Sequence, residues 1–240
     1  MAVNLVQQVF RIRTDATAAQ GGTPVWAAAQ NAVPVLSPSA LFRIRFAIAN
    51  TGTTSAASQA YNLFVSRNAG AYAQVPNVVG SNAVYCADAT AGASADDSPI
   101  TTSLLTGASG TFTGVGVYDF TGTTSALIIP TLDYVEFEFG IQFNNAVIAQ
   151  GDTYAFRVYQ AGVVLTTYTV TPTLQVWTSM AASKLNAYAA MQVQDIRASK
   201  LNAYAVLIPS TLSASKLNAY AVLLSSGGTV SRRRQVRVIA

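Results

Sequence analysis

Apolar and polar residues alternate in short runs through most of residues 1–177. In residues 135–143 every second side chain is apolar, and residues 41–48 follow the same rule. A period of two residues is the signature of a β-strand with two different faces. Further candidate strands lie at residues 6–13, 61–66, 71–75, 154–159, 163–170 and 173–177.

The alternation also predicts the side of the sheet on which the charged residues lie. Glu136 and Glu138 alternate with apolar residues, and so do Arg43 and Arg45. We therefore expect all four on the solvated outer face of a sheet. Two nearby glutamates can form a catalytic pair, but this regular alternation favours an exposed face instead.

Turn signals between the runs predict the fold class. Arg67-Asn68-Ala69-Gly70 separates two candidate strands with residues that tolerate a left-handed backbone, so residues 61–75 are predicted to form a hairpin. No segment of residues 1–177 has a convincing helical period. The sequence predicts an all-β chain with an antiparallel β-sandwich, of Ig-like or jelly-roll type, over residues 1–177.

The remainder of the chain is a sixteen-residue repeat. Ser-Lys-Leu-Asn-Ala-Tyr-Ala occurs at residues 183–189 and recurs without slippage at 199–205 and 215–221. The repeats are residues 183–198, 199–214 and 215–230, followed by a diverged copy at 231–240 in which Arg232 stands in the lysine position. A fixed period of this kind indicates a repeat architecture.

Each copy alternates as a strand would, although its Ala and Leu content also suits a helix. Pro209 would stop a helix, so we expect strands of eight to ten residues with connections of about six, a length typical of hairpin loops. Their alanine-rich faces bury little apolar area. We therefore expect residues 178–240 to be an assembly arm completed by the body or by neighbouring subunits.

Composition excludes several classes of chemistry. Only 10% of the residues are charged, and the chain contains no histidine and a single cysteine, Cys86. Catalysis by Ser-His or Cys-His pairs and zinc sites that need imidazole are excluded. We expect no enzyme activity, cofactor or metal, and Cys86 is interpreted as a small buried residue.

Charge divides the chain in two. Residues 1–177 hold six arginines and nine acids, a net of −3, whereas residues 178–240 hold eight basic residues and one acid, a net of +7. The basic residues of the second part are the candidate partner-binding residues: Lys184, Lys200, Lys216, Arg232, Arg233, Arg234 and Arg237. A protein partner is favoured over nucleic acid, because no aromatic side chain that could stack on bases lies near the arginine run.

Two other segments bear on binding and location. Asp88, Asp96 and Asp97 lie in a small-residue stretch whose spacing matches no EF-hand, so a solvated loop is favoured over a calcium site. The N-terminal residues lack the basic and apolar regions of a signal peptide, and no apolar run is long enough to span a bilayer. We expect synthesis in the cytoplasm and no membrane partner.

Two resemblances add expectations to this reading. Gly-Asp-Thr-Tyr-Ala-Phe-Arg-Val at residues 151–158 resembles the penultimate strand of fibronectin type III and immunoglobulin-like domains, and residues 61–72 resemble their central hairpin. In that family the tyrosine makes a corner hydrogen bond. The stretch 76–130 is longer than the corresponding connection of the family and could hold extra strands near residues 111–120.

The repeat resembles those at the ends of structural proteins of tailed bacteriophages. This resemblance implies a virion component, such as a capsid decoration or head-fibre protein, that contacts other virion proteins and copies of itself. The alternatives are a tail or collar protein, or an adhesion module that binds a host-surface carbohydrate or receptor. The adhesion module would need exposed aromatic side chains in one groove, for which the candidates are Trp26, Tyr72, Tyr85 and Tyr118.

Overall fold

The regular structure in the described part of the chain consists of β-strands, which confirms the all-β prediction. The computed structural model describes residues 2–14, 23–34, 36, 41–87, 95–149 and 151–176, and the backbone of strands at 180–187, 195–203, 211–219 and 230–231. Contacts divide the chain into two compact units, Met1–Val176 and Trp177–Ala240.

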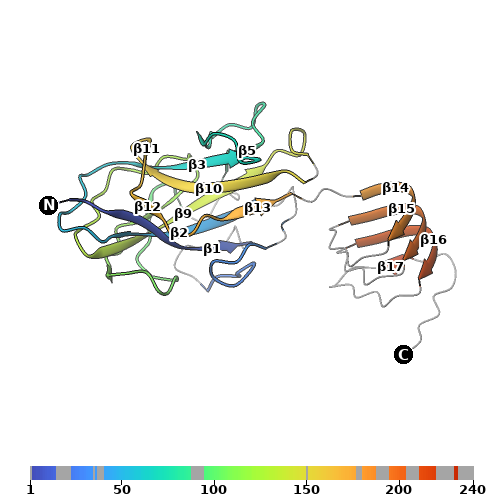
Figure 1. Cartoon of the computed structure of the whole chain (residues 1–240), viewed down its shortest axis with the longest axis horizontal. Helices are drawn as coiled ribbons and strands as arrows, with labels where there is room; N and C mark the ends of the chain where they lie inside the picture. The colour runs from blue at the N-terminus through green and yellow to red at the C-terminus, as the bar shows by residue number, and fades with distance from the viewer. Residues whose placement is uncertain are drawn as a thin grey trace. The chain divides into compact units, whose positions relative to one another are not determined.

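The first sheet of unit 1 is built on three long antiparallel strands (Figure 1). These are β1 (Leu5–Arg13), β2 (Leu41–Asn50) and β9 (Asp133–Phe143), with β2 in the middle. Five short strands complete the sheet: β5 (Val84–Cys86), β6 (Ser98–Pro99), β7 (Thr111–Phe112), β8 (Val117–Asp119) and β12 (Thr167–Tyr168).

The second sheet is antiparallel throughout and centres on β10 (Thr153–Gln160). Its other strands are β3 (Tyr61–Arg67), β4 (Ala73–Gln74), β11 (Val163–Val164) and β13 (Thr173–Gln175). The β3–β4 hairpin confirms the predicted turn, since Asn68 and Ala69 both have left-handed backbone, with φ of 53° and 58°.

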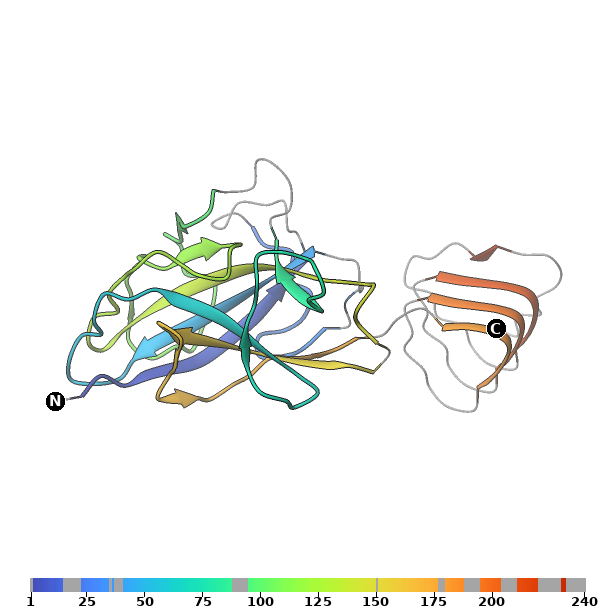
Figure 2. The same ribbon diagram turned by 90° about the horizontal axis from the view of Figure 1, so that it is seen from above.

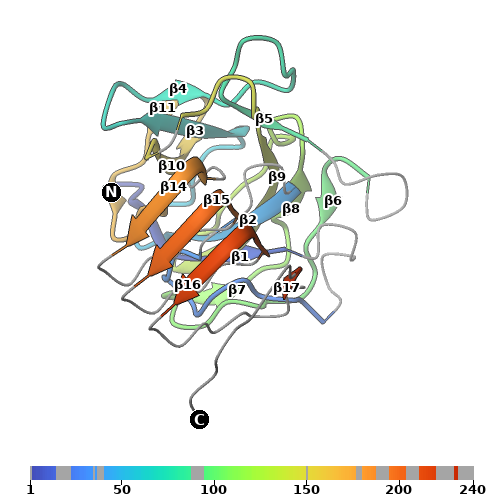
Figure 3. The same ribbon diagram turned by 90° about the vertical axis from the view of Figure 1, so that its right-hand side faces the viewer.

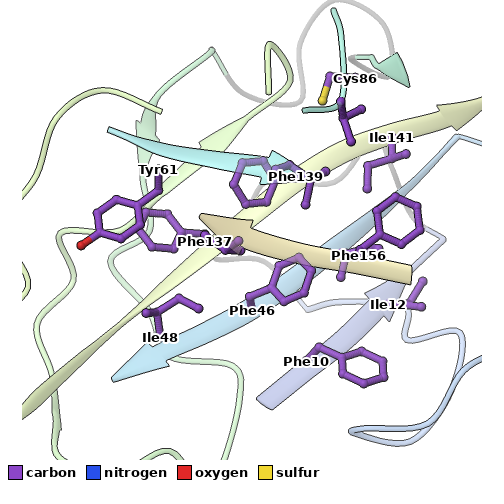
Figure 4. Packing of buried hydrophobic residues seen from close by; sticks show 14 of the residues in the cluster. Phe10, Ile12, Phe46, Ile48, Tyr61, Cys86, Phe137, Phe139, Ile141 and Phe156 are labelled. Carbon is purple, nitrogen blue, oxygen red and sulfur yellow. The ribbon is translucent and has the colours of Figure 1, made fainter. Parts of the chain in front are cut away.

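The two sheets lie one above the other and share an apolar core (Figures 2 and 4). The five alternate apolar residues of β9 are buried in this core, as the pattern predicted. Aromatic rings join the layers: the Tyr61 and Phe137 centroids lie 4.8 Å apart, and those of Phe143 and Tyr154 lie 5.1 Å apart. This packing accounts for most of the hydrophobic stabilisation of the unit.

The prediction of a purely antiparallel sandwich is wrong for the first sheet. β12 runs parallel to β1, and both β7 and β8 run parallel to β9. β7 and β8 belong to the long connection 76–130, which is where the sequence allowed extra strands. The connection therefore adds short strands that pair with β9 in parallel before the chain enters β9 itself.

The outer face of the first sheet also differs from its prediction, because its charged residues are buried. Arg43, Arg45, Glu136 and Glu138 are 0% exposed, and Arg13 joins them from β1. The Glu138 carboxylate forms ion pairs with three arginines: Arg45 Nε lies 2.6 Å from it, Arg43 Nη1 3.1 Å and Arg13 Nη1 3.4 Å. Arg45 Nη1 also lies 3.0 Å from Glu136. We call these five residues the buried charge cluster.

The long connection covers this cluster. The carboxylate of Glu136 accepts hydrogen bonds from the Ser103 hydroxyl at 2.7 Å and from the amides of Leu104 and Leu105 at 3.1 and 3.0 Å. The Tyr118 ring lies over the Arg43 guanidinium, 4.4 Å from its centroid. The connection therefore adds a third layer over a face that the alternation alone had assigned to solvent.

Unit 2 is a parallel sheet with one strand for each repeat (Figure 3). Its strands are β14 (Met180–Ala187), β15 (Asp195–Ala203), β16 (Thr211–Ala219) and β17 (Val230–Ser231). β14, β15 and β16 pair in register at an offset of 16 residues, whereas β17 pairs with β16 at an offset of 18, and all these pairs are parallel, so hairpin connections are wrong for this unit. Parallel neighbours require the chain to return to the same end of the sheet after each strand, as in a solenoid.

Candidate functional site

Three of the predicted partner-binding residues come together in unit 2. Lys184 pairs with Lys200, and Lys200 pairs with Lys216, at successive positions of the parallel ladder. Adjacent strands lie about 4.8 Å apart, so the lysines form one row across the sheet. We call this set the lysine row.

A second row accompanies the first. Asn186, Asn202 and Asn218 also occupy successive register positions. Each asparagine follows its lysine by two residues, which places both rows on the same face of the sheet, with leucine and alanine rows on the opposite face. Repetition at a fixed offset thus aligns the lysine positions in one row and the asparagine positions in another.

The other predicted partner-binding residues, Arg232, Arg233, Arg234 and Arg237, lie outside the described residues. β17 lies at the boundary of the third and fourth copies, and its two residues pair with Leu212 and Ser213 of β16 at an offset of 18 residues, two more than the repeat period. The position of the arginine run relative to the lysine row therefore stays a prediction.

Within the described residues of unit 2, the outer strands are incompletely paired. In the described ladder β14 pairs only with β15, and β17 covers only Leu212 and Ser213 of the nine-residue β16. Unpaired backbone N–H and C=O groups at a sheet edge can bind another strand.

In unit 1, Glu136 and Glu138, the two glutamates that alternate along β9, lie beneath the covering connection. Glu136 and Glu138 are both fully buried, and arginine or backbone N–H groups occupy their oxygens. A substrate could reach them only if the segment around Leu104 moved. Their arrangement holds the covering connection in place.

Asp96 and Asp97 of the predicted solvated loop are half-buried, and they attach this loop to the segment that follows β8. Asp96 accepts a hydrogen bond from the Phe120 amide at 3.1 Å, and Asp97 accepts one from the Ser125 amide at 2.7 Å. Asp88 lies outside the described residues. Among the residues that the structure describes, no group of three or more acidic or cysteine side chains is placed to hold a metal ion.

The sequence did not single out Asp119, which is buried beside this loop. Burial raises the pKa of its carboxyl to about 6, with a smaller contribution from the negative charge of Asp96. Hydrogen bonds from the Thr121 hydroxyl at 2.9 Å and the Gly122 amide at 2.6 Å oppose this rise. Cys86 is buried as expected, and burial raises the pKa of its thiol.

The four aromatic residues proposed for a carbohydrate groove do not share one surface. Tyr118 is a buried residue of the covering connection itself, and the Trp26 ring centroid lies 4.6 Å from the Arg11 guanidinium. Tyr85 lies on β5 of the first sheet and hydrogen bonds to Gln142. Tyr72 instead lies next to the second sheet.

A different aromatic group gathers on the second sheet. Phe64 and Tyr159 stack with centroids 3.9 Å apart, and the Arg157 guanidinium lies 4.6 Å from the Tyr72 ring and 4.4 Å from the Tyr168 ring. Cross-strand pairs of this kind stabilise a sheet face. The alternation of residues 154–159 places Arg157 and Tyr159 on that face, but the sequence does not show that Tyr72 and Tyr168 reach them.

Comparisons with models of protein families, with curated proteins and with solved structures found no match. In the described part of the chain, no helix is long and apolar enough to cross a membrane.

Proposed function

We propose that this chain is a non-enzymatic structural component of a phage particle, most simply a capsid decoration or head-fibre protein. In this proposal unit 2 attaches the protein to its neighbours in the virion through β contacts. The observation that carries the proposal is the parallel repeat sheet with incompletely paired edges. Such edges favour strand addition by another subunit, either a second copy or another virion protein.

We infer further that unit 1 is immunoglobulin-like. Its pairing order β1-β2-β9-β8 in one sheet and β4-β3-β10-β13 in the other matches the A-B-E-D and C′-C-F-G orders of that fold. Two features differ from the family pattern. β8 pairs with β9 in parallel, and the Tyr154 hydroxyl donates to the Asp152 carboxylate at 3.1 Å instead of to upstream backbone.

Co-sedimentation with phage particles tests the attachment. The full chain should sediment with particles, whereas a chain ending at residue 176 should stay in the supernatant although its body is folded. A control variant, Arg67→Gln, alters an exposed guanidinium of the body and should sediment like the wild type. Full incorporation of the shortened chain would show that unit 1 docks and the repeats are displayed.

Two other functions are alternatives to a capsid decoration or head-fibre protein. A tail or collar protein would use the same contacts at another site on the particle, and imaging of particles labelled on this chain distinguishes it. An adhesion module would use the aromatic group formed by Phe64, Tyr72, Tyr159 and Tyr168 around Arg157. Glycan-array binding by residues 1–177 that is lost on Tyr72→Ala substitution would favour the adhesion module.

A further inference from the structure

The lysine row concentrates positive charge on one face of unit 2. Strands β14 to β16 contain four cations, Lys184, Arg197, Lys200 and Lys216, against the single acid Asp195. Asp195 is paired with Thr211 and lies five residues before Lys200 on the same strand. Within these described strands, no acid takes a register position next to a lysine.

Like charges on directly neighbouring strands repel one another. In this sheet the repeat places lysine beside lysine on β14, β15 and β16. Residues before the lysine differ between copies, with Met180, Ile196 and Leu212 in one row and Ala181, Arg197 and Ser213 in another. The lysine is the same in all three. An anion bound along the row would relieve the repulsion.

The array defines the chemistry of that anion. Its charges recur at the strand spacing of about 4.8 Å, so a polymer with one negative charge per short repeat can occupy all three lysines at once. The asparagine amides of the second row can both donate and accept hydrogen bonds, which suits sugar hydroxyls.

We propose that the lysine and asparagine rows form a binding site for an acidic polysaccharide. Lys184, Lys200 and Lys216 pair with carboxylates of successive sugars, while Asn186, Asn202 and Asn218 hydrogen bond to their hydroxyls. The proposal uses a face of the sheet, whereas the proposed attachment uses its edges, so neither depends on the other. Duplex DNA fits this array less well, because on each of its strands the charge recurs about every 3.4 Å of helix axis.

Native-gel retardation of the full chain by polygalacturonate tests the site, with neutral dextran as the uncharged polymer. The wild type should be retarded by polygalacturonate but not by dextran, and the retardation should weaken as ionic strength rises. Replacing all three lysines with glutamine should weaken binding roughly tenfold or more. The matched variant with three arginines keeps the charges and should still bind.

Each other outcome overturns the proposal. Retardation that is equal for the wild type and the glutamine variant would show that the row is not the site, and absence of retardation would show that the polymer is not the ligand. Lysine-dependent binding of single-stranded DNA without binding of polygalacturonate would reassign the row to nucleic acid. If the triple glutamine variant loses the wild-type circular dichroism spectrum, the single Lys200→Gln variant carries the test. Particle co-sedimentation is a separate readout, so failure here leaves the proposed attachment untouched.

Discussion

Glu138 is the centre of the buried charge cluster, since arginines from β1 and β2 converge on its carboxylate. Removing one member of a buried ion pair leaves an uncompensated charge in a medium that solvates it poorly, at a cost of about 3–5 kcal/mol. The cluster holds three guanidinium groups and two carboxylates, so neutralising one carboxylate increases an existing excess of positive charge.

We expect Glu138→Gln to lower the free energy of unfolding by about 3–5 kcal/mol for this reason. Urea unfolding followed by tryptophan fluorescence measures the change, and Trp26 beside Arg13 is a local reporter. Asp133→Asn, at the half-buried start of the same strand, is the control and should change stability by less than about 0.5 kcal/mol. Equal effects of the two variants would mean that the cluster contributes little.

Asp119 makes the free energy of unfolding decrease as the pH rises. Because burial raises its pKa to about 6, the folded state holds this proton more tightly than the unfolded state, where the pKa is about 3.9. The resulting stabilisation is complete below pH 4 and is lost as the pH rises through 6. Between pH 4 and pH 7 this group should lower the free energy of unfolding by about 2–3 kcal/mol.

Asp119→Asn should remove this part of the pH dependence, and urea unfolding at a series of pH values measures it. Asp152 acts with the opposite sign. Burial disfavours its charged form, but hydrogen bonds from Asn68, the Ala149 amide, Arg67 and Tyr154 outweigh this and lower its pKa. Its contribution is present above the unfolded pKa and is lost only in more acidic solution. If the free energy of unfolding of Asp119→Asn depends on pH as that of the wild type does, Asp119 is not the source of this dependence.

At the scale of elements, Gly140 shows how closely β9 approaches its covering layer. A Cβ atom at this position would overlap the carbonyl oxygen of Ala87 and lie 2.9 Å from the Tyr118 hydroxyl. The Ala87 amide also hydrogen bonds to the Gly140 carbonyl. The lack of a side chain here lets the connection lie directly on the strand.

Gly140→Ala should therefore push the covering connection away from β9 and cost about 1–3 kcal/mol. Hydrogen exchange distinguishes this from general unfolding: the amides of Leu104 and Leu105 should lose protection, while those of β10 keep theirs. Loss of protection in both sheets at once would show that the covering layer is not a separate element. Tyr118→Phe combined with Gly140→Ala should recover part of the loss, because the hydroxyl is one of the two obstructions.

The elements also show what the sequence could and could not predict. Alternation identified the inner face of β9 correctly, because residues such as Phe137 and Phe139 can be buried in only one direction. It failed for Glu136 and Arg45, since alternation separates two faces without showing whether the second is covered. The segment that covers Glu136, residues 103–105, contains no strand, so no period marks it in the sequence.

In the repeat segment, the period predicted the length of each unit but not the direction of neighbouring strands. Connections of about six residues are compatible with hairpins, whereas the structure pairs identical residues in parallel. The missed signal was the identity of the copies. An antiparallel arrangement would bring unlike positions opposite each other, so it gives no reason to repeat one sequence at every strand. The lysine row follows from register and could not be derived from composition.

At the scale of the whole molecule, the apolar core described for unit 1 runs from Leu5 to Val176 and joins both of its sheets. Unit 1 thus has a two-sheet core of its own and should be stable without the repeats. A fragment of residues 1–176 should be monomeric and should unfold cooperatively in urea, with a β-type circular dichroism spectrum at room temperature. A helical or unfolded fragment would show that the repeats complete its core.

The in-register ladder of unit 2 has a consequence for how this protein can change in size. Because β14, β15 and β16 pair at a constant offset of 16 residues, gain or loss of one such copy leaves these strands in register. An insertion of any other length would shift the ladder and bring unlike residues together. The segment can therefore grow or shrink in whole units, each adding about 4.8 Å to the stack and one lysine to its row. Unequal recombination between the copies would produce such variants directly. The length of the sheet and the number of lysines in its row would then change together, one copy at a time.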